Sequence, residues 1–258
     1  MLKAVWFDMD DTLLSINLGA FVYMYVKDQS MLLASIARKN LFAMSAQFSA
    51  AYLSMFDEGR TDDLTNAAWL EAEIERRCGV PVSDPVVADV FSYYEREVLP
   101  TRNNRVVAAR PREGADKALA RVLDGGYRCA LVTNPSFTRE CIECRMRWGG
   151  IDGVPFEHVT HMGNSTRCKP SARYYRENLE RMGLATDEVL MVGNDPKRDF
   201  PSPDCGIRTA YVGAGEPERA LWCGDMEGFA RDFDKIVELF ERDVEASRGC
   251  PRDDEEDA

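Results

Sequence analysis

The sequence predicts an α/β fold in which a doubly wound parallel sheet carries an inserted domain made only of helices. Over the second half of the chain, apolar runs of strand length alternate with helical segments, which is typical of a parallel sheet built from βαβ units. Another apolar run stands near the start, at 3–7, and the block 15–100 after it contains helical segments without a convincing strand. The first strand therefore belongs most simply to the same sheet, and the helical block 15–100 is an insertion after it.

The first strand ends in two carboxylates that stand two residues apart. Residues 4–7 (AVWF) form an unbroken apolar run, as expected of a strand buried on both faces, and Asp8 and Asp10 follow it in DMDDT. Ligands bind outside the carboxyl ends of such strands, and neighbouring carboxylates repel each other unless a cation lies between them. Mg²⁺ fits, because it commonly takes one or two carboxylates together with a substrate phosphate. Taken alone, the stretch is explained equally well by carboxylates that only cap a turn or a helix.

The helical block begins with a part rich in Ala, Met, Leu and aromatic residues, which indicates the interior of a domain rather than a ligand-binding surface. A turn at 56–63 (FDEGRTDD) interrupts it. Arg60 in this turn is most simply a solvated arginine, and the alternative is a contact with a carboxylate or second phosphate of a substrate. The expected helices cover 18–56, the segment from an N-cap at Thr61 or Asp62 through Cys78, and the segment from Ser83 and Pro85 to about Pro100.

The second half of the chain supplies most of the predicted sheet. A helix ending at Leu123 is closed by two glycines, and further elements follow in alternation. The expected strands are 129–133, 157–160, 189–193 and 208–213, and the expected helices between them are about 137–148 and 170–181. The predicted domains are a core formed by 1–14 and 101–247, the helical insertion 15–100, and an acidic disordered tail at 248–258.

Polar side chains follow the ends of three predicted strands. Thr133 and Asn134 come at the end of the second, after the carboxylates of the first. Asn194 and Asp195 follow the strand 189–193, and Asp199 lies four residues further on. Because the carboxyl ends of parallel strands meet at one edge of a sheet, these side chains are expected to form one site.

A lysine is expected at the same edge. Lys169 stands immediately before Pro170, a favoured first residue of a helix, so the positive end of a helix dipole should face the site as well. The set matches phosphoryl transfer, in which Mg²⁺ and lysine neutralise the phosphoryl oxygens while a hydroxyl and backbone amides orient them. Asp8 is then the expected nucleophile, giving an aspartyl-phosphate. Asp10 is the expected acid for the leaving alcohol and the base for the hydrolytic water.

Four motifs, in order and over nearly the whole chain, resemble those of the haloacid dehalogenase-like (HAD) superfamily. DMDDT resembles the DxDxT motif, LVTN the second motif, RCKPSARYY the third and MVGNDPKRD the acidic fourth. The resemblance implies a Rossmann-like core with a cap domain, and the helical insertion between the first two motifs is similar to the C1-type cap. It also implies Mg²⁺-dependent hydrolysis of the phosphomonoester of a small metabolite.

The motifs place the family's site residues on this chain. The expected catalytic residues are Asp8, Asp10, Thr133 and Lys169, and the expected phosphate-binding residues are Thr133, Asn134 and Lys169. Asp8, Asp10 and Asp195 are the expected metal ligands. Asn194 is the alternative ligand from the fourth motif, with Asp195 favoured for its charge and Asp199 expected as a partner of the ligands.

Three competing functions differ from phosphatase in specific features. Dehalogenases that the chain resembles keep the first aspartate but lack the second, so Asp10 favours a phosphate ester. Receiver-type signalling modules also combine Asp, Thr, Lys and Mg²⁺, but they are short, have no helical insertion and lack a built-in acid/base. A catalytically silent binding module would lack part of the motif set, and no part is missing.

Composition argues against several partners. The 258 residues carry a net charge of −12, which disfavours nucleic acid or an anionic membrane as the main partner. No apolar signal segment begins the chain, and the longest uncharged stretch, 40–56, contains polar residues, so a cytoplasmic enzyme without a membrane span is expected. The eight cysteines are then reduced thiols. Oligomeric state is not predicted.

A zinc site is the weaker interpretation of the cysteine and histidine pattern. Cys141 and Cys144 form a CxxC motif, and His158 and His161 are the two histidines of the chain. The histidine spacing is one residue short of the zinc pattern, and residues i and i+3 of a strand point to opposite faces. Half-buried helix cysteines are therefore expected.

Overall fold

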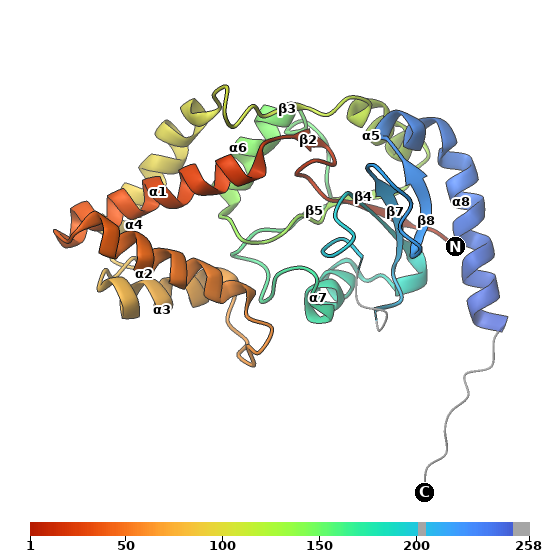
Figure 1. The fold of residues 1–258 in the computed structure, drawn as a ribbon. Coiled ribbons are helices and arrows are strands. Elements are labelled where there is room, and N and C mark those ends of the chain that lie inside the picture. Colours follow the sequence, from red (N-terminus) through yellow and green to blue (C-terminus); the bar gives the residue numbers. More distant parts are fainter. Residues whose placement is uncertain (201–204, 250–258) are drawn as a thin grey trace, which may run out of the picture.

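A computed structural model describes residues 1–200 and 205–249 of the chain (Figure 1). Six parallel strands form one sheet in the order β5-β4-β1-β6-β7-β8, and the chain builds outward from β1 first on one side and then on the other. This is the doubly wound order, so the predicted fold class is confirmed, and the reversal lies between β1 and β6. The strands are β1 (Ala4–Phe7), β4 (Arg128–Leu131), β5 (His158–Val159), β6 (Val189–Gly193), β7 (Arg208–Val212) and β8 (Ala220–Gly224).

Alternate side chains of β1 enter two different cores. Val5 and Phe7 belong to the core covered by α5 (Ala115–Asp124) and α8 (Met226–Gly249). Ala4 and Trp6 belong to the core covered by α7 (Ala172–Met182), on the opposite face. All four β1 side chains are fully buried, which is why this strand reads as an unbroken apolar run.

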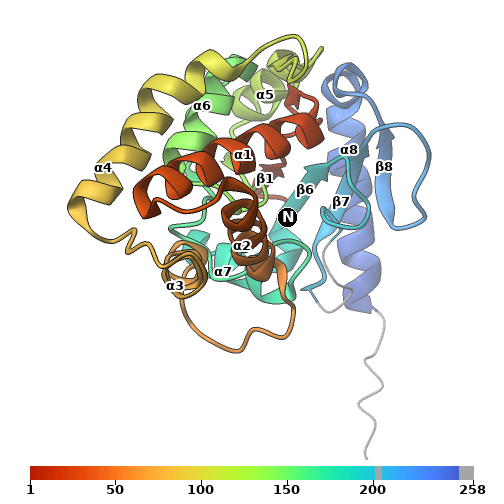
Figure 2. The same ribbon diagram turned by 60° about the vertical axis from the view of Figure 1, so that its left-hand side comes forward.

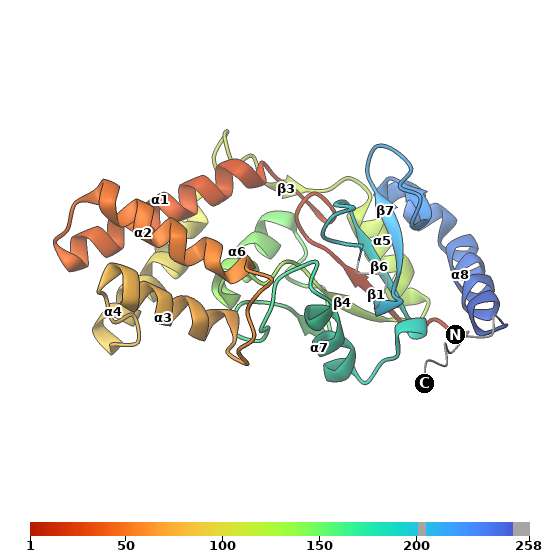
Figure 3. The same cartoon turned by 60° about the horizontal axis from the view of Figure 1, so that its bottom comes forward.

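The helical block lies to one side of the sheet, at the left in Figures 1 and 3, and Figure 2 views it more nearly end on. No described residue between the two-residue strands β2 (Leu14–Ser15) and β3 (Arg110–Pro111) is in a strand. These two strands pair antiparallel where the chain leaves and re-enters the core. The block consists of α1 (Leu18–Ala37), α2 (Leu41–Leu53), η1 (Ser54–Phe56), α3 (Asn66–Cys78), α4 (Pro85–Tyr93), the π-helical η2 (Tyr94–Val98) and η3 (Leu99–Arg102).

The predicted starts of α3 and α7 are wrong, and that of α4 is right. The N-cap of α3 is Thr65, whose hydroxyl accepts a hydrogen bond from the Ala68 amide, and not Thr61 or Asp62. The Asp62 carboxylate is engaged instead by the Arg60 guanidinium and the Leu64 amide, which keeps this part of the chain in a loop. The start predicted at Ser83 and Pro85 agrees with α4, which has Asp84 as its N-cap and Pro85 in its first turn.

The helix predicted to start at Pro170 starts at Ala172. A turn closed by a hydrogen bond from the Ser171 amide to the Cys168 carbonyl precedes it, so Pro170 lies in that turn. The predicted segment 137–148 agrees with α6 (Arg139–Gly149), which begins after the N-cap Thr138. The short helix η4 (Thr186–Glu188) precedes β6.

The C-terminal part of the core was not predicted as secondary structure. Strand β8 and helix α8 extend the sheet and its cover beyond the last predicted strand. Helix α8 includes Arg248 and Gly249, the first two residues of the predicted acidic tail, and 250–258 lie outside the described residues. Among the described residues, no helix combines the length and the apolar character needed to cross a bilayer.

Candidate active site

The eight predicted site residues line one cavity of about 70 Å³ at the carboxyl ends of β1, β4 and β6. This edge contains the reversal of strand order, where doubly wound sheets bind ligands. Asp11, Leu18 and Arg198 also line the cavity and were not predicted. The predicted residues are Asp8, Asp10, Thr133, Asn134, Lys169, Asn194, Asp195 and Asp199.

A tight turn after β1 places Asp8 and Asp10 on the same cavity. The Asp8 amide extends the strand pairing by donating to the Val192 carbonyl at 2.9 Å. The Met9 carbonyl then accepts hydrogen bonds from the next three amides after Asp11, and the chain turns back on itself. Asp11 is in the left-handed region with φ 57°, a conformation that aspartate tolerates better than most residues.

A buried charge cluster surrounds Lys169. Its ammonium group lies 2.8 Å from Asp8 Oδ1 and 2.6 Å from Asp199 Oδ1, and its side chain is 1% exposed. Burial and the neighbouring Asp199 raise the pKa of Asp8 to about 7, although Lys169 opposes the shift. The two carboxylates raise the pKa of Lys169 well above its usual range, outweighing its burial. One lysine therefore faces two acids, and a further cation would favour the ionised form of Asp8.

Asp199 pairs with Lys169 and also holds the loop after β6. Its Oδ2 accepts hydrogen bonds from the amides of Asn194 and Asp195 at 3.0 and 2.9 Å. Gly193 leaves room for this carboxylate, because a Cβ atom there would lie 2.4 Å from it. Asp199 is 1% exposed, which supports a role in positioning the loop rather than in binding substrate.

The structure places Asn194 and Asp195 differently within this loop. Asn194 Oδ1 accepts a hydrogen bond from the Thr12 hydroxyl at 3.2 Å and so faces the β1 turn. Asp195 Oδ1 accepts from the Lys197 amide at 2.9 Å, and its Oδ2 lies 3.7 Å from Arg198 Nε. Both residues line the cavity, so both remain candidate ligands.

Oxygen donors at this site suit a hard divalent cation. Within 1–200 and 205–249, no three His, Cys, Asp or Glu side chains are grouped closely enough to hold a metal ion. Mg²⁺ does not require such a group, since one or two carboxylates, waters and a substrate phosphate satisfy it. Asp8, Asp10 and either Asn194 or Asp195 supply donors of this kind to one cavity.

Arg145 is a site residue that the sequence reasoning missed. It projects from α6 and is fully buried, and its Nη1 lies 2.6 Å from Asp10 Oδ2. Its guanidinium packs on the rings of Phe21 and Phe137, with 5.0 and 4.4 Å from Cζ to the ring centroids. Asp10 Oδ1 is buried and has no hydrogen-bond partner among the described residues. The sequence signal that could have indicated Arg145 is its helical spacing from Cys141 and Trp148, which places a charged residue on the apolar face of α6.

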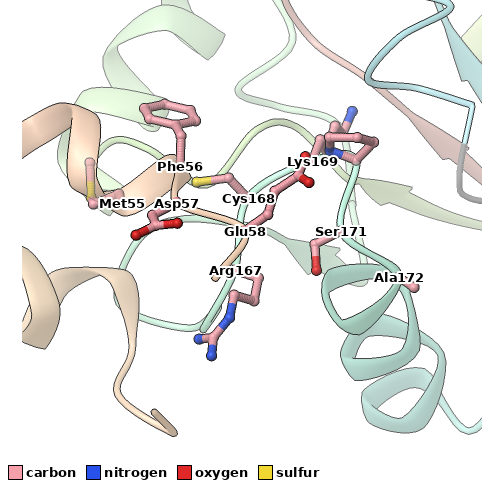
Figure 4. A pocket seen from close by; sticks show the side chains of 10 residues that line it. Met55, Phe56, Asp57, Glu58, Arg167, Cys168, Lys169, Ser171 and Ala172 are labelled. Carbon is pink, nitrogen blue, oxygen red and sulfur yellow. The ribbon is translucent and has the colours of Figure 1, made fainter. Parts of the chain in front are cut away.

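Thr133 and Asn134, which follow β4, are held by hydrogen bonds between main-chain and side-chain groups. The Thr133 carbonyl accepts hydrogen bonds from the hydroxyl groups of Thr160 and Tyr174, at 2.6 and 2.7 Å. Asn134 Oδ1 accepts a hydrogen bond from the Lys169 amide at 3.3 Å, which connects the segment after β4 to the turn at 168–171 before α7. Figure 4 shows the other side of that turn, where Lys169 lines a cavity of about 350 Å³ together with residues 55–58 of the helical block.

Arg60 is not a solvated turn arginine. Its side chain is 1% exposed and donates hydrogen bonds to Asp62, Asn66 and the Leu64 carbonyl. Its Cζ also lies 4.3 Å from the centroid of the Trp69 ring. These contacts stabilise the loop before α3, and Arg60 does not line the catalytic cavity.

The cysteine and histidine motif forms ordinary structural contacts. Cys141 and Cys144 are fully buried in α6 rather than half-buried. The His158 ring pairs with Asn178 Oδ1 at 2.9 Å, and His161 Nδ1 accepts from the Gly163 amide.

Sequence comparison finds phosphatases. The chain is 26% identical over 226 residues to glyceraldehyde 3-phosphate phosphatase of Pyrococcus abyssi, covering 84% of this chain and 83% of that protein. It is 25% identical over 236 residues to N-acetylmuramic acid 6-phosphate phosphatase of Pseudomonas aeruginosa, covering 87% and 89%.

Structural comparison finds the same fold. A HAD phosphatase from Thermococcus onnurineus matches with a TM-score of 0.55 at 16% identity, covering 92% of this chain and 98% of the other. A β-phosphoglucomutase from Clostridium difficile matches with a TM-score of 0.56 at 14% identity, covering 95% and 99%.

The family model for haloacid dehalogenase-like hydrolases matches residues 2–202, which include all four motifs. With the phosphatase relatives, this match confirms the prediction of an enzyme of the phosphatase type. The chain belongs to the haloacid dehalogenase-like hydrolase family.

Proposed function

We propose that the protein is a Mg²⁺-dependent phosphomonoesterase that acts on a small phosphorylated metabolite through an aspartyl-phosphate at Asp8. The observation that carries this proposal is the meeting of Asp8, Asp10 and Lys169 at one cavity. The relatives named above are phosphatases of a triose phosphate and of a sugar phosphate, which supports a small phosphate ester as substrate. A cytoplasmic location and the C1-type cap with limits at 15–100 stay predictions.

In the first step, an Asp8 carboxylate oxygen attacks the phosphorus atom and the bond to the ester oxygen breaks. Lys169 holds Asp8 Oδ1 and supplies a positive charge beside the phosphoryl group. The Thr133 hydroxyl and Asn134 line the cavity from the end of β4, where they can bind phosphoryl oxygens. The products of this step are the aspartyl-phosphate and the alcohol.

Asp10 handles the proton in both steps. Arg145 holds Oδ2 and so fixes the Asp10 carboxyl group at the cavity, where it can exchange a proton with a substrate atom. In the first step the protonated acid gives its proton to the leaving oxygen. In the second step the carboxylate takes a proton from water as the water oxygen bonds to phosphorus and the bond to Asp8 breaks, releasing inorganic phosphate.

Asp8, Asp10 and Asp195 are the proposed Mg²⁺ ligands, with Asn194 as the alternative to Asp195. Because the carboxyl group of Asp10 pairs with Arg145 and is proposed to transfer the proton, Asp10 would bind the ion through its main-chain carbonyl. A bound divalent cation would neutralise phosphoryl charge and favour the carboxylate form of Asp8, whose pKa burial raises. Five acids and two basic residues line the cavity, which supports the need for an added cation.

Turnover of p-nitrophenyl phosphate tests the proposal. The purified protein should be inactive in EDTA and regain activity with Mg²⁺, and Asp8→Asn should be folded but inactive because an amide is a poor nucleophile. Acid quench of the wild type with ³²P-labelled substrate should trap label on the protein. Full activity in EDTA would refute the metal requirement, and rapid turnover by Asp8→Asn would refute the nucleophile.

Two further variants decide between the candidate ligands. Asp195→Asn and Asn194→Ala should be compared by the Mg²⁺ concentration needed for half-maximal activity. If Asp195 is the ligand, its variant requires much more Mg²⁺ while Asn194→Ala stays close to the wild type. The opposite result would transfer the role to Asn194.

A further inference from the structure

A cavity with an apolar lining on its helical-block side continues from the catalytic acid into the helical block. It has a volume of about 390 Å³, includes Asp10, and lies between the block and the loop after β4. A second cavity of about 520 Å³ continues it along α1 and α2, which pack side by side (Figure 3). The residues shared by the two cavities are Leu18, Val22, Tyr52, Leu53 and Arg198.

The helical block contributes almost no polar group to this path. Among the described residues that line the two cavities, none from the block is charged, and its polar groups are the Ser49 hydroxyl and two tyrosine hydroxyls. Burial raises the pKa of Tyr52, so its phenol stays neutral. The core supplies the charged residues on the path, Asp10 and Arg198, and the polar residues Asn134 and Ser136.

We propose that the preferred substrate is a phosphate monoester with an extended apolar leaving group, which lies between α1 and α2 during transfer. This inference rests on the proposed function, because it takes Asp10 as the residue beside the leaving oxygen. A leaving group that starts at Asp10 enters the 390 Å³ cavity first. Since one water occupies about 30 Å³ in the liquid, that cavity has room for about a dozen water-sized groups.

The lining selects against polar leaving groups. Hydroxyls or a carboxylate of a sugar phosphate would give up water here and meet few partners beyond the core residues Asn134, Ser136 and Arg198, which costs binding along the helical block. Methylene groups would gain about fourfold each in kcat/KM, the equivalent of about 0.8 kcal/mol per buried methylene. Arg198 is half-exposed and only loosely paired with Asp195, at 3.7 Å, so it can meet the phosphate at the mouth of the path.

A chain-length series tests the inference. We expect kcat/KM with Mg²⁺ to rise by about fourfold per methylene from ethyl through butyl to hexyl phosphate. Glyceraldehyde 3-phosphate and glucose 6-phosphate should be poorer substrates than hexyl phosphate. A flat or falling series in an active enzyme would overturn the inference and leave the proposed function intact.

A binding measurement keeps the two proposals separable. If none of the esters, including p-nitrophenyl phosphate, is hydrolysed, the proposed function fails. Titration calorimetry with ethyl and hexyl phosphate then decides the inference by itself, since hexyl phosphate should still bind more tightly. Equal binding of the two esters would overturn it.

Two valine variants test the location of the leaving group. Val22→Asn puts an amide into the lining shared by both cavities and should lower kcat/KM for hexyl phosphate by roughly tenfold relative to ethyl phosphate. Val90→Asn is the matched control, because Val90 lies on the surface of α4 and lines neither cavity. Equal effects of the two variants on the chain-length series would refute this location.

Discussion

Glu95 in the helical block makes the stability of the protein depend on pH. The residue lies in η2, is 6% exposed, and its Oε1 accepts hydrogen bonds from Tyr25 at 3.0 Å and Thr138 at 2.7 Å. Burial raises its pKa from 4.5 to about 7, with a smaller contribution from Glu140, although the two hydrogen bonds oppose the shift. The folded protein therefore binds this proton more tightly than the unfolded chain.

The direction of the effect follows from that difference. Because the folded pKa is raised, the stabilising contribution of Glu95 is fully present below about pH 4.5 and is lost as pH rises through about 7. The whole shift corresponds to about 3 kcal/mol of unfolding free energy. Most of it, about 2.5 kcal/mol, should be lost between pH 5 and pH 8.

Urea unfolding of the wild type and of Glu95→Gln measures this contribution. The glutamine oxygen can still accept from Tyr25 and Thr138, but the side chain does not titrate. In EDTA-containing buffers, the unfolding free energy of the wild type minus that of the variant should fall by about 2.5 kcal/mol from pH 5 to pH 8. Glu97→Gln is the control for the change from glutamate to glutamine, since Glu97 is exposed in the same turn. A constant difference for Glu95→Gln would refute the reasoning.

Three further predictions concern the catalytic cavity. Asp10→Asn should lower the rate of alkyl phosphate cleavage by about a hundredfold or more in rapid-quench kinetics, and by less for p-nitrophenyl phosphate, whose leaving group needs no proton. Equal losses in the first step would remove Asp10 as the proton donor. Arg145→Met should lower the free energy of unfolding in urea by about 3–5 kcal/mol, because it leaves the Asp10 carboxylate buried without a partner. The double variant Asp10→Asn/Arg145→Met should recover most of that loss. A double variant no more stable than Arg145→Met would contradict this. Gly193→Ala should displace the Asp199 carboxylate, lowering stability by about 1–3 kcal/mol and activity with it, whereas Gly153→Ala, where a Cβ meets no atom within 4 Å, should change neither.

Most of the catalytic cavity could be predicted because its signals are local in the sequence. An apolar run followed by an acid or a hydroxyl marks the end of a buried parallel strand, and parallel strands end at one edge. Asp8, Thr133 and Asn194 therefore come together once the strands pair. The same reasoning did not find β8, whose residues are only partly buried at the edge of the sheet, so its apolar signal is short.

Features that depend on contacts between distant parts of the chain could not be predicted in this way. Arg145 and Asp10 are 135 residues apart, and neither motif nor periodicity indicates that the arginine turns toward the β1 turn. Arg60 was expected in solvent because its neighbours in sequence are polar. Its burial comes from Asn66 and Trp69, which meet it only after the loop folds over the start of α3.

The position of Asp10 is linked to the packing of the helical block through Arg145. The guanidinium that holds Asp10 Oδ2 lies on Phe21 of α1 and on Phe137 of the core, whose ring centroids are 5.4 Å apart. Two of its nitrogens, Nε and Nη2, have no hydrogen-bond partner among the described residues, so the rings and the carboxylate are its main surroundings. If α1 moved away from the core, water would reach the guanidinium and weaken its contact with Asp10, because solvated ion pairs contribute little. Asp10 is therefore held most firmly when the block is seated on the core.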